Sequence, residues 1–127
     1  MAAKNLTLNS DAREALLALG TLEDTNPKLL TGVLDEDPSP AVRAAAARGL
    51  SRLRRREAIP DLLDALDDDD LQVRTWAITA LNNTLRSTRF VYKADDPREV
   101  RLRNISIIRT KLTTWGVIGS DAGGSGE

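Results

Sequence analysis

Apolar residues recur along this chain at intervals of three and four positions, which is the spacing of one face of an α-helix. A clear stripe of this kind lies near the end of the chain, at Ile105, Ile108, Leu112 and Trp115. Ala and Leu dominate the composition and aromatic residues make up only 3%, which favours helices over strands. The pattern predicts five or six helices, over about residues 11–22, 27–34, 40–54, 57–66, 71–85 and 97–115.

Local signals mark where several of these helices begin and end. Asn26 and Ser39 are N-cap residues, and each is followed by a proline at the first helical position. Pro60 falls in the first turn of its helix, where the missing N–H does least harm. Gly116 is placed to end the last helix.

One pattern occurs twice, with every member shifted by 31 positions. The two copies are Asp37, Val42, Arg43, Ala46 and Leu50, and Asp68, Val73, Arg74, Ala77 and Leu81. A period of this size indicates stacked helical hairpins, each of which buries its apolar stripe against the next. We therefore expect an all-α, right-handed α-solenoid of about three hairpins, over residues 10–35, 38–66 and 70–116. Residues 1–116 would form one domain and residues 117–127 a flexible Gly/Ser-rich tail.

The repeated pattern resembles HEAT repeats within the armadillo-like class, specifically the short bacterial type known from phycobilisome (bilin) lyase subunits. The match is good over residues 26–85 and poor over 10–25, where Ala12 stands in place of the arginine. The last segment is similar to a terminal unit of such proteins, with an aromatic pair and then a long arginine-bearing helix. Its matching residues are Phe90, Tyr92, Arg101 and Trp115.

The resemblance implies a binding scaffold in which aspartate and arginine side chains of successive repeats pair as a ladder. The ladder residues here would be Asp37, Arg43, Asp68 and Arg74. Asp37 and Asp68 precede helix starts, so we also expect them to cap those helices. Trp76 and Trp115 are both expected to pack in the core.

The composition removes most catalytic chemistry. The chain has no cysteine and no histidine, which excludes a thiol nucleophile, a Cys/His zinc site and a Ser-His-Asp relay. The acidic run at residues 67–70 lacks the alternating ligands and central glycine of a calcium loop. We therefore expect no catalytic residue, no cofactor and no metal, and hence no enzyme. No secretory signal or membrane span is evident, so a cytoplasmic location is expected.

Charge is nearly balanced overall, with 18 Lys plus Arg against 19 Asp plus Glu, but it is not evenly distributed. Turns between repeats are acidic, and turns inside the second and third repeats are basic. We call the second set the basic edge: Arg52, Arg54, Arg55, Arg56, Arg86 and Arg89. Aspartate at helix starts and arginine at helix ends explain part of this pattern. The triplet 54–56 exceeds that need, so the basic edge is the candidate partner-binding surface.

These features predict a non-catalytic protein–protein interaction module or scaffold whose partner has an acidic surface. A groove lined by the helices at 29–33 and 61–64 is the other candidate surface. Two further hypotheses stay open: phosphate-backbone binding of nucleic acid through residues 54–56, and an accessory role in a bilin lyase-like enzyme. An exposed end of the solenoid would also allow self-association.

Overall fold

The computed structural model describes residues 26–86 and 88–119, and every regular element within these ranges is helical. The helices are α2 (Pro27–Glu36), α3 (Pro40–Leu53), the 3-10 turn η1 (Arg56–Ala58), α4 (Ile59–Ala65), α5 (Leu71–Thr84) and α6 (Arg98–Thr114). The helix predicted at 11–22 lies outside the described residues. No helix of the described ranges combines the length and apolar character needed to cross a bilayer.

The helices begin as the sequence predicts at Asn26 and Ser39, but the role expected of the two repeated aspartates is wrong. Ser39 caps α3 and Asp70 caps α5, each by accepting a hydrogen bond from the backbone N–H three residues on. Asp37 and Asp68 lie two residues before those caps. Their Oδ1 atoms accept hydrogen bonds from the N–H groups of Ser39 and Asp70, both at 2.9 Å. Each aspartate therefore holds the turn that leads into the helix.

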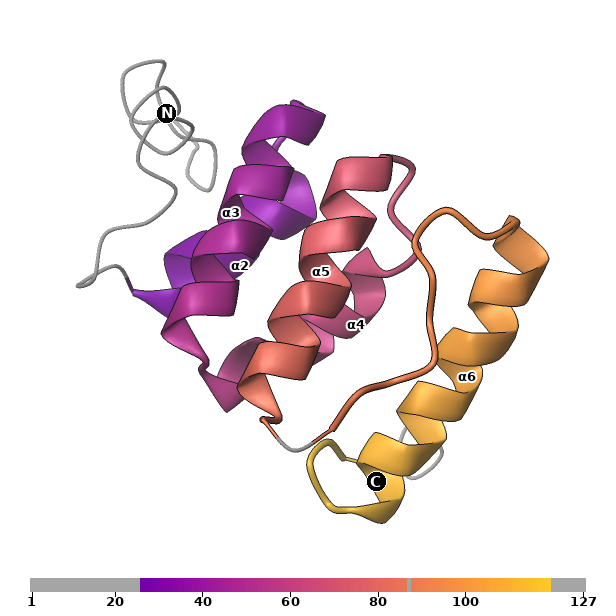
Figure 1. Ribbon diagram of the computed structural model, residues 1–127. Coiled ribbons are helices and arrows are strands. Elements are labelled where there is room, and N and C mark those ends of the chain that lie inside the picture. Colours follow the sequence, from indigo (N-terminus) through magenta and orange to yellow (C-terminus); the bar gives the residue numbers. More distant parts are fainter. Residues whose placement is uncertain (1–25, 87, 120–127) are drawn as a thin grey trace.

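Helices α2 to α5 form two layers. In Figure 1, α3 and α5 lie side by side in one layer, while α2 and α4 lie behind them. α3 and α5 run in the same direction, so both end at the same edge of the molecule. Short connections between antiparallel neighbours give this arrangement, as in other stacked helical hairpins.

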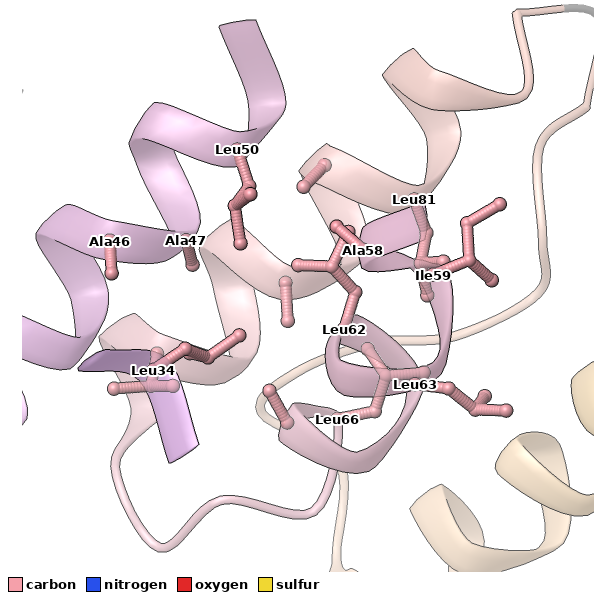
Figure 2. Close-up of a cluster of buried hydrophobic side chains, with 14 of the residues drawn as sticks. Leu34, Ala46, Ala47, Leu50, Ala58, Ile59, Leu62, Leu63, Leu66 and Leu81 are labelled. Carbon is pink, nitrogen blue, oxygen red and sulfur yellow. The ribbon is translucent and has the colours of Figure 1, made fainter. Parts of the chain in front are cut away.

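The core lies between these layers and is built from leucine, isoleucine and alanine (Figure 2). Leu50 of α3 and Leu81 of α5 hold equivalent places in the repeat, and their side chains are 1% and 0% exposed. Small residues such as Ala46 and Ala77 are also fully buried, which lets α3 and α5 approach closely. Trp76 is half-buried against this core, and the guanidinium of Arg48 lies 5.7 Å from its ring centre.

The last helix is placed differently from the others. The chain leaves α5 and passes between α5 and α6 as an extended segment over about residues 88–93 (Figure 1). It then turns at residues 94–96 and returns in α6 in the direction of α5. The hydroxyl of Tyr92 in this segment donates to the Leu66 carbonyl, and Phe90 is buried. Because the segment spans the length of the layer, α6 runs parallel to α5, whereas a short connection would have made it antiparallel.

The expected burial of Trp115 is wrong, since this side chain is 52% exposed. Helix α6 buries Ile105, Ile108 and Leu112. Trp115 follows as the C-cap residue, and its N–H still donates to the Lys111 carbonyl, so it lies at the very end of the helix. One side of its ring instead packs on Phe90, with ring centres 6.1 Å apart and planes inclined by 23°. Gly116 adopts a left-handed conformation with φ of 75° directly after it.

Candidate functional site

The repeated arginine of the first full copy joins two repeats. The Nε and Nη2 atoms of Arg43 each donate to the carboxylate of Asp68 at 3.1 Å, and its Nη1 donates to the Asp37 carbonyl at 2.9 Å. Both members of the pair are largely buried, with 16% and 14% of their side chains exposed. A bidentate pair of this kind fixes geometry as well as adding energy.

Arg74 repeats only half of this arrangement. Its Nη1 donates to the Asp68 carbonyl at 2.8 Å, as Arg43 does one repeat earlier to Asp37. Its Nε donates to the Ala94 carbonyl at 2.9 Å, where a further repeat would supply an aspartate. The ladder of aspartate and arginine side chains thus ends at the segment before α6, which supplies a main-chain carbonyl in place of a carboxylate. Contacts within the fold hold these side chains, so they offer little to a ligand.

A second charged cluster, which the sequence pattern did not indicate, ties α6 to the preceding repeat. Arg98 forms two hydrogen bonds with the carboxylate of Asp67, at 3.1 and 2.8 Å, and Arg101 approaches the same carboxylate at 3.7 Å. The hydrogen bond from Arg98 lowers the pKa of Asp67 below its usual range. Asp67 and Arg98 are 31 positions apart, so the repeat period was the signal that could have found this pair.

The basic edge gathers where α3, α5 and α6 end, which is the same edge of the molecule for all three helices (Figure 1). A hollow of about 380 Å³, which we call the arginine hollow, is lined by Arg54, Arg86, Arg89, Asn82 and Asn83. The structure therefore brings together three of the six predicted arginines, which come from two successive repeats.

A second hollow adjoins the first because Arg86 lines both. This tryptophan hollow measures about 510 Å³, and its lining includes Arg56, Leu85, Trp115 and Val117. The basic edge thus continues into a surface that combines one further arginine with apolar side chains and two threonines, Thr84 and Thr88.

The other two predicted arginines do not join these hollows. Arg55 pairs with Glu57 at 3.0 Å, and both side chains are about half exposed. Arg52 is exposed at the end of α3 and lines neither hollow. The candidate site therefore narrows to Arg54, Arg56, Arg86 and Arg89.

These four guanidinium groups have no protein partner within residues 26–86 and 88–119. None of them forms an ion pair or a side-chain hydrogen bond there, and this includes the carbonyls at the ends of α3 and α5. Arginines that served only to cap helix ends would be expected to bond those carbonyls. Direct capping of helix carbonyls therefore does not account for their positions.

The backbone at Arg54 is also unusual. Arg54 ends α3 with φ of 55° and ψ of 48°, and it is the one described residue other than glycine with a positive φ. An L-residue in this left-handed region is less stable than glycine, which is the usual choice at a helix end. Local strain of this kind is often found where a side chain serves a function.

The other candidate surface, on the layer of α2 and α4, is acidic. Asp35 of α2 shares a hydrogen bond with Asp61 of α4, and Asp64 lies 3.8 Å from Arg109 of α6. Partial burial, the hydrogen bond to Asp61 and the neighbouring carboxylates raise the pKa of Asp35 to about 7. This surface therefore has charge opposite to that of the basic edge. In the two described ranges, no three His, Cys, Asp or Glu side chains gather so as to hold a metal ion.

Comparison with known proteins gives one result. The family model for HEAT repeats matches this chain twice, over residues 8–82 and over residues 26–106. The two matches together cover the helices α2 to α5 and the first half of α6. Neither the curated proteins nor the solved structures gave a match.

Proposed function

The chain belongs to the HEAT-repeat family of helical solenoids, and from this premise we propose that it is a non-catalytic module that binds another protein through its basic edge. Proteins of this family generally act as interaction scaffolds. The observation that carries the choice of surface is the group of four arginines without protein partners within the described residues. A field from several unpaired guanidinium groups attracts acidic partners and speeds their encounter.

The rival surface on α2 and α4 is less suited to the same partner. Asp35, Asp61 and Asp64 give it negative charge, and Asp35 and Asp61 already share a hydrogen bond. An acidic partner would be repelled there. This surface contains the predicted groove at 29–33 and 61–64, so the basic edge is the preferred binding surface of the two.

Site-specific photo-crosslinking in an extract of the source cells tests this proposal. A photoreactive benzoylphenylalanine replaces Thr88, which lines the tryptophan hollow, or Asp69 on the opposite, acidic edge as a matched control. We expect discrete protein adducts from position 88 and not from position 69. The adducts should disappear when Arg54, Arg86 and Arg89 are changed to glutamate.

Two results would count against the proposal. Equal adducts from both positions, or adducts that persist in the charge-reversed chain, would show that the basic edge is not the binding surface. Adducts at position 88 that nuclease removes would instead favour the nucleic-acid hypothesis, because its binding also rests on arginine contacts to phosphate.

The finer predictions of the sequence analysis stay predictions. They are the bacterial, phycobilisome lyase-type subfamily with its accessory role in a bilin lyase-like enzyme, the cytoplasmic location, and self-association through a solenoid end. No observation on the described residues favours the lyase role over general protein binding.

A further inference from the structure

The two hollows of the basic edge differ in chemistry although they share one residue. Arg54, Arg86 and Arg89 dominate the arginine hollow, whereas Leu85, Trp115 and Val117 bring apolar surface to the tryptophan hollow. Arg86 stands between the two hollows because it lines both. A ligand that fills both hollows must therefore present negative charge and an apolar group close together.

The arginine hollow is equipped to bind carboxylates. Its guanidinium groups form no ion pair or side-chain hydrogen bond with any residue in 26–86 or 88–119, so no group within these ranges occupies their donors. Asn82 adds a positioned amide, because its Oδ1 accepts the Phe90 N–H at 3.2 Å and its NH2 group is left to donate. Guanidinium groups match the planar, two-oxygen geometry of a carboxylate.

The tryptophan hollow is equipped to bind an apolar side chain. Phe90 packs on one side of the Trp115 ring and holds it, while 52% of the Trp115 surface stays exposed. An exposed, immobilised tryptophan beside arginine has the composition found at the centres of protein interfaces. Its surface loses contact with water only when a ligand covers it.

Charge over the rest of the molecule argues for a short segment and against a long polyanion. The chain carries a net charge of -1, and aspartates occupy residues 67–70 on the opposite edge. A nucleic-acid backbone needs a continuous basic track, and within the described residues the unpaired arginines of the hollows occupy one edge only. A peptide needs only a few carboxylates and one anchor.

We infer that the two hollows together bind an acidic peptide segment that carries one large apolar residue, with its carboxylates in the arginine hollow and its apolar side chain against Trp115. This inference rests on the proposed protein-binding function and specifies the partner. The carboxylates confer attraction at a distance, and the apolar residue fixes the register of the peptide in the groove.

Tryptophan fluorescence and anisotropy with defined peptides test the inference on the full chain. The protein carries Trp76→Phe, so that Trp115 alone reports. The probe is a short fluorescein-labelled peptide of glutamate and serine with one central leucine, and its control has serine at that place. We expect the leucine peptide to shift Trp115 emission and to bind about tenfold more tightly than the control.

Charge variants provide the second arm. Arg54→Glu with Arg86→Glu should weaken leucine-peptide binding by about tenfold or more at low salt. Lys93→Glu with Arg103→Glu changes the net charge equally, but both residues are exposed and line neither hollow. This control pair should leave the affinity within about twofold.

Several results would overturn the inference. They are equal binding of the two peptides, equal losses in the two charge variants, and tighter binding of an oligothymidylate of matched charge. Absence of peptide binding, when Thr88 crosslinks to a protein as proposed above, would overturn the peptide inference alone. Absence of both would overturn the proposed function as well.

Discussion

At Arg54, one side chain affects both the stability of the fold and the proposed binding surface. A positive φ at a non-glycine residue costs free energy that most helix ends avoid by using glycine. Arg54 nevertheless lines the arginine hollow together with Arg86 and Arg89. The free energy lost to this backbone conformation and the contribution of the side chain to binding can be measured separately.

Arg54→Gly is expected to raise the free energy of unfolding by roughly 1 kcal/mol, because glycine adopts the left-handed conformation without strain. Thermal and urea melts measure this. Arg52→Gly is the control, since Arg52 lies in the last turn of α3 and lines neither hollow. Glycine there should lower stability, by at most about 1 kcal/mol. A loss of stability in the Arg54→Gly chain would mean that its conformation carries no strain.

Asp35 gives the fold a pH dependence on the layer of α2 and α4. Its pKa is raised from 3.8 to about 7, so the folded chain holds this proton more tightly than the unfolded chain. The resulting stabilisation is complete below the unfolded pKa, falls as pH rises between the two values, and is absent above the folded pKa.

Asp35→Asn should mimic the protonated state and keep the hydrogen bond to Asp61. We expect its melting temperature to match that of the wild type near about pH 4 and to exceed it near about pH 8, where Asp35 of the wild type is charged. Asp69→Asn, at an exposed position on the acidic edge, is the control for the loss of one carboxylate away from this pair. If the difference in melting temperature between Asp35→Asn and the wild type does not change with pH, the raised pKa of Asp35 is contradicted.

At the scale of the helices, the predicted all-α solenoid is confirmed, and the repeat period is the reason that it could be predicted. Equivalent positions such as Leu50 and Leu81 face the same core because each helix repeats one stripe. The direction of α6 could not be predicted from this period. It depends on the path of the segment at 88–97, which lies outside the repeated pattern.

Leu50→Ala and Leu81→Ala should each lower the free energy of unfolding by about 2–5 kcal/mol, through lost burial and the cavity left behind. Leu102→Ala is the matched control because Leu102 is 41% exposed, and it should change stability by less than about 0.5 kcal/mol. Urea melts of the three variants measure this. Losses below about 1 kcal/mol at both core positions would mean that the two repeats do not pack as described.

At the scale of the whole molecule, a nearly balanced charge is separated between two edges. Acidic turns at residues 67–70 and 95–96 lie where α5 and α6 begin, and the hollows of the basic edge lie where α3, α5 and α6 end. The sequence predicted the basic edge from turn positions alone. It could not predict the tryptophan hollow, because the parallel course of α6 is what brings Trp115 beside Arg56 and Arg86.

The salt dependence of partner binding tests the central claim most directly. The wild-type chain is compared with the triple variant Arg54→Glu, Arg86→Glu, Arg89→Glu, using the protein captured by crosslinking at Thr88. Affinity is measured from low salt to physiological ionic strength, where screening acts within about 8 Å. We predict that wild-type affinity falls steeply with salt, and that the folded triple variant binds weakly with little salt dependence. Equal affinity and an equal salt slope in the two chains would contradict the claim that the basic edge binds the partner.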